Sequence, residues 1–304
     1  MSKKHENDLY KLIGNLKMGK KIYVIGANGY IGSLLVEYLN TAGHEVEVSN
    51  YRLPDIPKNV IDTDIVIHLA TAGGGTVHKP RFGNDNPEYM KKVNLDGMKN
   101  LIKGVKNKST KILFVSSAAV YGKFEDAPLV GENAPLNPIS NYGKDKSEAE
   151  NILMKSGIDY MILRPCGVFG KSTHNNFGNA FLNKILNNAI ENKQIEVFGG
   201  EQLIDTVYLL DVINIILRAC GKEWKSNAIY NVGGEITSIK NMLEIVANAL
   251  AKAGINCPLV VQPFNGKPAA ILDSSKLKND FKWEPTALTI AIPELVKGYL
   301  NTLK

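Results

Sequence analysis

The sequence predicts an α/β protein, with a doubly wound parallel sheet and a second, smaller α/β domain. Three observations lead to this fold class. Short apolar segments alternate with segments of helical periodicity between residues 21 and 165. A glycine-rich turn follows the first apolar segment, and the rhythm of the chain changes after Gly167. Strands that alternate with helices are joined by right-handed crossovers, which produce a parallel sheet covered on both faces.

The elements of the first part follow in order along the chain. The apolar segment 21–26 ends in glycine and is expected to be a buried strand. Residues 30–43 have helical apolar spacing and end at Gly43, a helix stop. The remaining strands are expected over 45–49, 64–70, 111–117 and 159–165, and the helices over 87–107 and 142–157.

The connection between the second and third expected strands is short. Only 13 residues separate Asn50 from Asp64 (64 − 50 − 1 = 13), and Pro54 and Pro57 are among them. A crossover helix needs about ten or more residues itself. We therefore expect that a strand or helix usually found at this place is missing.

The second part begins after Gly167. It is expected to form a helix over 177–193, a strand over 195–199, a strand and helix over 205–220, and a helix over 241–254. We assign residues 20–170 and about 206–231 to the first domain, and about 171–205 and 233–304 to the second. In residues 1–19, helical spacing of Leu9, Leu12, Ile13 and Leu16 predicts an N-terminal helical extension.

Composition excludes several classes of protein. The 304 residues are 44% hydrophobic and 22% charged, which is ordinary for a globular protein. No apolar segment approaches the ~20 residues that span a bilayer, and the N-terminus lacks the apolar core of a signal peptide. The net charge of +6 comes from scattered lysines, which argues against nucleic acid as a partner. The odd, sparse set of three cysteines indicates reduced thiols, so we expect a cytoplasmic protein. The cysteines and the five dispersed histidines have no metal-site spacing, so we expect no metal, and we expect no membrane partner.

A glycine pattern lies between the first expected strand and the first expected helix. Glycines in GANGYIG (26–32) allow a tight turn and let a pyrophosphate approach the helix N-terminus, whose partial positive charge stabilises it. The spacing is GxxGxxG rather than GxGxxG, so its place after a strand carries the prediction of a dinucleotide site. The cofactor-binding residues expected here are Gly26, Asn28, Gly29, Tyr30, Ile31 and Gly32.

The end of the second expected strand predicts which dinucleotide binds. Such chains usually carry an acidic residue about 20 positions after the glycine motif, where it holds a ribose hydroxyl. Here Asn50 lies 18 positions after Gly32 (50 − 32 = 18), and Tyr51 and Arg52 follow. Asn50 does not repel a 2′-phosphate and Arg52 could pair with it, so we predict NADP(H) over NAD(H). The alternative is that Arg52 points into solvent and Asn50 serves the 2′-hydroxyl of NAD(H).

Three residues form a candidate proton relay. Tyr142 and Lys146 have i, i+4 spacing, which places them on one helix face. A lysine ammonium near a phenol lowers the pKa of the phenol from ~10, so the tyrosine can exchange a proton at neutral pH. Ser117 follows an apolar strand, at the edge where α/β sheets bind ligands. The predicted catalytic residues are therefore Ser117, Tyr142 and Lys146.

Together these motifs resemble those of the extended short-chain dehydrogenase/reductases, the NAD(P)-dependent nucleotide-sugar epimerase/dehydratase family. The resemblance runs from about residue 20 to 300 and includes DIVIHLA (64–70), VNLDGMKNL (93–101) and LRPCGVFG (163–170). It implies a Rossmann fold and hydride transfer at a sugar carbon, with Tyr142 as general acid/base, Lys146 on the nicotinamide ribose and Ser117 on the reacting oxygen. It also implies a cofactor pocket that includes Leu69, Ala70, Thr71, Asn94, Tyr142, Lys146, Pro165 and Val168.

The chain departs from the family on the substrate side. Ala118 and Ala119 stand where family dehydratases carry an Asp-Glu pair, which argues against 4,6-dehydration. Ile204 replaces an arginine that grips the substrate diphosphate, and Gly167 replaces an asparagine. The bidentate phosphate clamp must therefore be rebuilt from lysines or be lost. The predicted substrate-binding residues are Lys79, Arg81, Ala118, Asn176 and Lys267, the first two in a glycine-rich loop expected to form a lid.

Several functions remain open at this point. We expect a nucleotide-sugar 4-keto reductase that uses NADPH. The first alternative is a nucleotide-sugar 4-epimerase that retains NAD. The missing arginine at Ile204 motivates two others: a non-catalytic NADP sensor on the same fold, and an enzyme for a small ketone or aldehyde. The resemblance also implies a homodimer formed through two helices.

Overall fold

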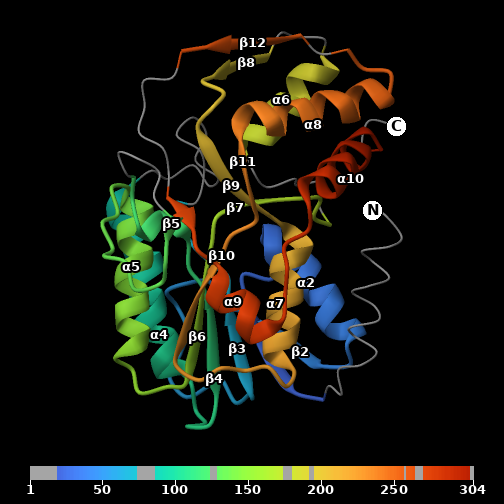
Figure 1. Cartoon of the computed structure of the whole chain (residues 1–304). Helices are drawn as coiled ribbons and strands as arrows, with labels where there is room; N and C mark the ends of the chain where they lie inside the picture. Colours follow the sequence, from blue (N-terminus) through green and yellow to red (C-terminus); the bar gives the residue numbers. More distant parts are fainter. Residues whose placement is uncertain are drawn as a thin grey trace.

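The main sheet has six parallel strands and a doubly wound topology. The computed structural model describes residues 19–73, 86–123, 129–173, 180–191, 195–256, 258–263 and 270–301. The strand order is β10-β6-β4-β3-β1-β2, with every neighbouring pair parallel, which confirms the predicted fold class (Figure 1). The strands are β1 (Lys21–Ile25), β2 (Glu45–Val48), β3 (Ile65–His68), β4 (Lys111–Val115), β6 (Tyr160–Pro165) and β10 (Ala228–Val232).

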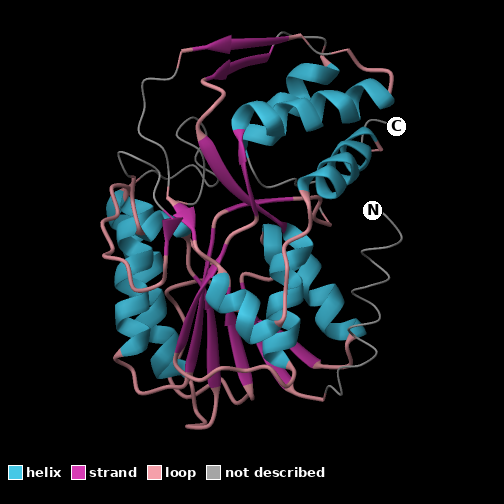
Figure 2. Cartoon of the chain, in the orientation of Figure 1, coloured by secondary structure: helices cyan, strands magenta, loops and turns pink. Residues whose placement is uncertain are grey.

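Helices cover both faces of this sheet (Figures 1 and 2). One face carries α2 (Tyr30–Thr41) and α7 (Leu209–Cys220). The other carries α4 (Gly97–Gly104) and α5 (Asn141–Met154). A parallel sheet that is buried on both faces needs apolar residues along the whole length of its strands, which explains why the strand segments read as continuous apolar runs.

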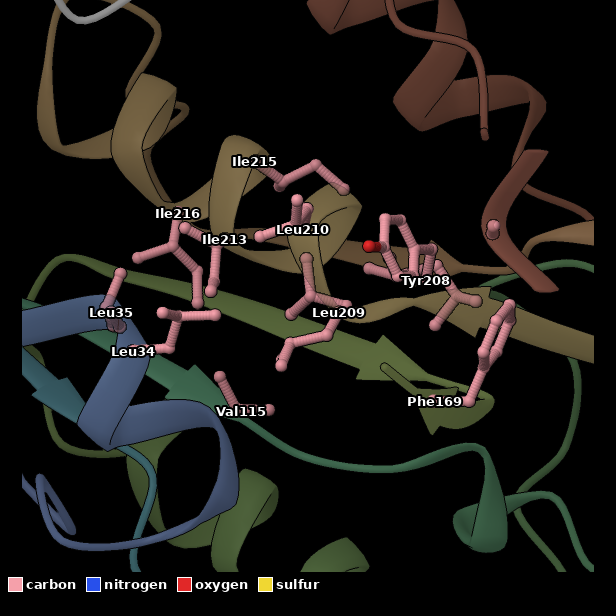
Figure 3. Close-up of a cluster of buried hydrophobic side chains, with 14 of the residues drawn as sticks. Leu34, Leu35, Val115, Phe169, Tyr208, Leu209, Leu210, Ile213, Ile215 and Ile216 are labelled. Carbon is pink, nitrogen blue, oxygen red and sulfur yellow. The ribbon is translucent and has the colours of Figure 1, made fainter. Parts of the chain in front are cut away.

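Successive residues of the strands enter different cores. Ile22 and Val24 of β1 pack in the core beneath α2 and α7, whereas Tyr23 and Ile25 pack beneath α4 and α5. This alternation follows from the strand geometry, in which neighbouring side chains point to opposite faces. Figure 3 shows side chains of α2, among them Leu34 and Leu35, facing apolar side chains of α7.

The connection from β2 to β3 contains no helix or strand, and its residues are all described. It makes one isolated parallel bridge, between Ile61 and Val105. In the part of the chain that the structure describes, no further strand lies beyond β2 in the main sheet, so β2 is an edge strand there. The predicted loss of an element at this place is confirmed.

The helix expected over 87–107 is present, but it changes type along its length. It runs as α3 (Pro87–Lys91), a π-helical turn η1 (Lys92–Asp96) and then α4. A π turn holds an extra residue and is frequent at functional sites. Asn94 lies within η1 and is buried.

Most of the remaining elements gather beyond the carboxyl end of β6, whereas α9 (Ser275–Phe281) lies beside β10 (Figure 1). A three-stranded sheet has the order β11-β9-β7, and β12 pairs with β8 and β13 with β5. The division of the chain into two domains stays a prediction, and residues 1–18 of the predicted N-terminal extension lie outside the described residues. No helix of the described chain is long and apolar enough to cross a membrane. These elements are β5 (Leu129–Val130), β7 (Gly167–Phe169), β8 (Ile195–Phe198), β9 (Leu203–Tyr208), β11 (Glu235–Ser238), β12 (Leu259–Gln262), β13 (Ile271–Leu272), η2 (Ala118–Val120), α6 (Ala180–Ile190), α8 (Ile239–Lys252), α9 (Ser275–Phe281) and α10 (Leu288–Leu300).

Candidate active site

The turn between β1 and α2 leaves no room for side chains. Gly26 has a φ of +90°, and a Cβ there would lie 2.6 Å from the backbone nitrogen of Ala70. A Cβ at Gly32 would lie 2.2 Å from the carbonyl oxygen of Gly26. No side chain caps α2 at its N-cap, Gly29, so backbone N–H groups stay available for an anion, and the turn fits the pyrophosphate of a dinucleotide. The other predicted residues of this turn are the exposed Asn28 and the half-buried Tyr30 and Ile31.

The segment after β2 is exposed and is held by the hydroxyl group of Ser49. The hydroxyl of Ser49 accepts a hydrogen bond from Tyr23 (2.9 Å) and one from the backbone nitrogen of Tyr51 (3.2 Å). Asn50, Tyr51 and Arg52 are all exposed. Arg52 forms no ion pair with any acidic side chain that the structure describes. Its guanidinium group is therefore available to a ligand at the end of β2.

Asn94 fastens the loop after β3. Its Oδ1 accepts hydrogen bonds from the backbone nitrogen of Ala72 (2.8 Å) and from the hydroxyl of Thr71 (3.2 Å). Its Nδ2 donates to the carbonyl oxygen of Ala72 (3.1 Å) and to Oδ2 of Asp145 (2.9 Å). The amide thus has two donated and two accepted bonds, its full capacity. Asn94 supports the predicted cofactor loop, Leu69 to Thr71, by fixing its backbone against α5.

Ser117 and Tyr142 are brought together by β4 and α5. β4 ends at Val115, so Ser117 lies just past the strand, where it is the N-cap of η2. Tyr142 is the second residue of α5, and the Ser117 hydroxyl lies close enough to its phenol to lower the phenol pKa. The close approach depends on Gly143, where a Cβ would lie 2.4 Å from the carbonyl oxygen of Ala119. Two of the three predicted catalytic residues therefore lie close together.

Lys146 is directed to the backbone rather than to the phenol. Its Nζ donates a hydrogen bond to the carbonyl oxygen of Val115 (2.8 Å) and lies 5.9 Å from the ring centroid of Tyr142. Burial raises the pKa of Tyr142, and the hydrogen bond with Ser117 opposes only part of that rise. The predicted lowering of this pKa is therefore wrong for this arrangement, because burial outweighs every other influence on the phenol. Burial also lowers the pKa of Lys146, to about 7.

The end of β6 leads into the wall expected to face the nicotinamide. Pro165 is buried and Val168 is half-buried. The thiol of Cys166 donates a hydrogen bond to Oδ1 of Asp205 (3.2 Å), which also accepts one from the backbone nitrogen of Gly234 (2.7 Å). Burial raises the pKa of the Cys166 thiol well above its usual value, so this thiol is a poor nucleophile at neutral pH.

The small sheet carries Ile204 and Gly167 at the positions where the family carries an arginine and an asparagine. Ile204 of β9 pairs with Thr237 of β11, and Thr206 of β9 pairs with Gly167 of β7. Paired residues share a face, as do residues two apart in a strand, so these four positions lie on one face. Ala118 is half-buried next to Ser117. The other predicted substrate residues, Lys79, Arg81, Asn176 and Lys267, lie outside the described residues, as does most of the expected lid loop.

Sequence reasoning misses a buried polar cluster behind the site. Arg164, within the apolar strand β6, pairs with Glu150 of α5, and both side chains are buried. The signals that could have indicated the pair are an arginine inside an apolar strand segment and a carboxylate four residues after Lys146. His68, at the end of β3, is also missed. Its pKa is lowered to about 3 by burial and, to a lesser extent, by Lys146.

Comparison with known families agrees with this geometry. The model of the NAD dependent epimerase/dehydratase family matches residues 22–233, a range that holds the glycine turn, Ser117, Tyr142 and Lys146. The chain belongs to this family. It is therefore an NAD(P)-dependent enzyme of the extended short-chain dehydrogenase/reductase type. Among the described residues, no group of three or more His, Cys, Asp or Glu side chains could hold a metal ion.

Relatives within the family have more than one activity. A UDP-glucose 4-epimerase of Lactobacillus helveticus is 29% identical, over 87% of this chain and 92% of that protein. A GDP-6-deoxy-D-mannose reductase of Pseudomonas aeruginosa is 26% identical, over 76% of this chain and 80% of that protein. The solved structure of RMD from Pseudomonas aeruginosa, complexed with NADPH, has a TM-score of 0.75 at 21% identity and covers 93% of this chain and 98% of its own. That structural likeness concerns the fold.

Proposed function

We propose that the chain is an NADPH-dependent reductase of a 4-keto group on a nucleotide-activated sugar. The observation that carries this proposal is the segment after β2. It offers Asn50 where an acidic residue would exclude a 2′-phosphate. Two residues later comes the exposed guanidinium of Arg52, which pairs with no acidic side chain among the described residues. A reductase exchanges its cofactor in each turnover, which suits an exposed cofactor end.

In the proposed reaction the C4 ketone becomes a hydroxyl by gaining a hydride and a proton. When bound, the reduced nicotinamide supplies the hydride. The hydroxyl of Tyr142 donates the proton to the ketone oxygen, and Ser117, which already contacts that hydroxyl, steadies the same oxygen. A raised pKa keeps Tyr142 protonated at neutral pH, which suits a proton donor. Lys146 would hold the nicotinamide ribose, and Asn94 would keep the loop after β3 in place.

The test is an assay with NADPH and 4-keto-6-deoxy sugars attached to dTDP, UDP or GDP. We expect NADPH absorbance to fall only when the keto sugar is present, and the reaction to be slower with NADH. Tyr142→Phe is the control for NADPH consumption by a contaminating reductase. Absence of NADPH consumption, together with interconversion of UDP-sugars without added cofactor, would reject the reductase.

The second candidate is a nucleotide-sugar 4-epimerase that retains NAD. The relative named UDP-glucose 4-epimerase favours it, because its alignment covers nearly all of both chains. In this candidate Tyr142 would accept the proton of the C4 hydroxyl while C4 gives its hydride to NAD, and would return the proton afterwards. The first step needs the phenolate, which the raised pKa of Tyr142 disfavours. The protein as purified would then carry bound NAD, which release by denaturation and enzymatic assay would detect.

Two alternatives rest on Ile204, which removes the phosphate-binding arginine. For a small ketone or aldehyde as substrate, no nucleotide would bind, which calorimetry with UDP, GDP, CDP and dTDP would reveal. For a non-catalytic NADP sensor, the contact between Ser117 and Tyr142 would have no purpose, so we place it last. We also propose a cytoplasmic homodimer, and light scattering on the purified protein would test the dimer.

A further inference from the structure

A buried ion pair links α5 to β6 behind the catalytic residues. Arg164 is 2% exposed and Glu150 is fully buried. Nε of Arg164 lies 3.1 Å from Oε1 of Glu150, and its Nη2 lies 2.6 Å from Oε2. The pair is therefore bidentate, the geometry in which an arginine holds a carboxylate most firmly.

A second arm of the same arginine reaches the segment after Ser117. Nη1 of Arg164 donates to the hydroxyl of Tyr121 (2.7 Å), and that hydroxyl donates to Oδ1 of Asn231 in β10 (2.7 Å). Tyr121 and Asn231 are fully buried. One guanidinium group thus joins the segment that carries Ser117, the helix that carries Tyr142 and Lys146, and two neighbouring strands of the main sheet.

Stability alone does not explain this arrangement. Desolvation of two charges costs several kcal/mol per ion in a protein interior, and well-packed apolar residues of similar volume are often as stable or more so. Surface pairs such as Lys99 and Asp96 carry no such cost. A buried pair in this place therefore points to a role in the reaction.

The charge of Glu150 acts on Lys146. The two residues are four apart in α5, on one helix face. Burial lowers the pKa of Lys146, and Glu150 is the charged group that opposes this. The other ionisable groups around the lysine are His68 from β3 and Tyr142 and Asp145 from α5. His68 is neutral at pH 7, since its pKa is about 3.

We propose that Glu150 is a positioning residue of the catalytic site: clamped by Arg164, it fixes α5 against the Ser117 segment and favours the ammonium form of Lys146. The part concerning catalysis rests on the proposed function. The part concerning Lys146 does not, because cofactor binding alone reports it. Arg164 and Tyr121 act through Glu150 and Ser117 and touch no reacting atom.

The experiment compares a variant with a matched control. Glu150→Gln alone would strand a buried arginine, so the test variant is Glu150→Gln with Arg164→Gln, a neutral amide pair. The control is Glu223→Gln with Arg218→Gln, because Arg218 and Glu223 also form a bidentate pair (3.0 and 2.8 Å). That pair lies near Gly221, whose carbonyl oxygen accepts a hydrogen bond from Lys20, just before β1 and so at the amino ends of the strands.

The readout is NADPH affinity from pH 5.5 to 9.5, followed by nicotinamide fluorescence. We expect wild-type affinity to fall on the alkaline side as Lys146 loses its proton, and Lys146→Met to abolish this limb. In the test variant the alkaline fall in NADPH affinity should occur about one pH unit lower, as expected for loss of an opposite charge near Lys146. The control variant should leave the pH of this alkaline fall unchanged. Glu150→Asp alone, which keeps the carboxylate charge, should place the fall close to its wild-type pH.

Two results would overturn the inference: a limb at the wild-type pH in the test variant, or an equal shift in the control. If the protein binds NADPH but reduces and epimerises no sugar, the proposed function fails while the Glu150 test stands. If it is active, the test variant should also lose about tenfold or more in kcat, since a displaced proton donor is costly. Thermal unfolding of each variant verifies that it is folded.

Discussion

The two sides of the site differ in the kind of group that recognises the ligand. At the β1–α2 turn the recognition comes from backbone N–H groups, and Gly26 and Gly32 leave no room for change. On the small sheet the family uses side chains, and here Ile204 and Gly167 replace an arginine and an asparagine. A backbone site tolerates little variation, whereas a side-chain site changes with single substitutions. The cofactor side should therefore be general to the family and the substrate side particular to this chain.

The largest expected effect concerns the residue that lies between the two sides. Tyr142→Phe removes the proton donor and should lower kcat by about 10³-fold, within the range for a general acid. NADPH affinity should stay near the wild-type value, because the ring that packs against Ala72, Met90 and Val93 is kept. Stopped-flow fluorescence and steady-state kinetics measure the two quantities. Unaltered turnover would assign the chemistry elsewhere and favour a sensor.

The next prediction concerns the cofactor side and the residue proposed to favour NADPH over NADH. Arg52→Ala should weaken NADPH binding by about 10- to 100-fold, the value of one charge-assisted contact of ~1.5–3 kcal/mol. Binding of NADH should not change, which makes NADH the internal control. The NADPH affinity of Arg52→Lys should lie between those of the wild type and of Arg52→Ala, because a lysine pairs with a phosphate without the planar fork of an arginine. Tighter binding of NADH than of NADPH by the wild type would contradict the prediction.

Much of the fold could be predicted from the sequence, because its signals are local. The apolar runs of β1, β3, β4 and β6 and the helix stop at Gly43 depend on neighbouring residues only. The π turn at Lys92–Asp96 could not be predicted, since it depends on contacts of Asn94 with the distant Ala72 and Asp145.

The site was predictable to a similar limit. Spacing could place Ser117, Tyr142 and Lys146 near one another, but not the direction of the lysine. That direction depends on the carbonyl of Val115 and on burial, which are properties of the folded core. The Arg164–Glu150 pair was missed because its partners are joined only by tertiary packing.

The substrate side is tested by restoring what the family carries. Ile204→Arg should raise affinity for UDP by about tenfold, since a bidentate arginine–phosphate contact is worth at least ~1.5 kcal/mol. Ile204→Lys is the matched control, with the charge but not the fork, and should gain less. Isothermal calorimetry with UDP measures both. If neither variant binds UDP more tightly than the wild type, the diphosphate does not pass this position. The substrate is then oriented differently from the substrates of the family.

The smallest expected effect compares a buried hydroxyl group of the substrate side with one that lies away from the site. Thr110, below the main sheet, donates its hydroxyl to the carbonyl of Thr63 (2.6 Å), whereas the buried hydroxyl of Thr206 has no hydrogen-bond partner among the described residues. Thr110→Val should therefore cost about 1–3 kcal/mol, because it strands an acceptor, while Thr206→Val should be neutral or slightly stabilising. Thermal or urea unfolding compares them. If Thr206→Val also weakens sugar binding, its hydroxyl is a substrate contact kept at a small cost in stability. Equal destabilisation by both variants would instead show that the hydroxyl group of Thr206 is hydrogen-bonded within the protein, as that of Thr110 is.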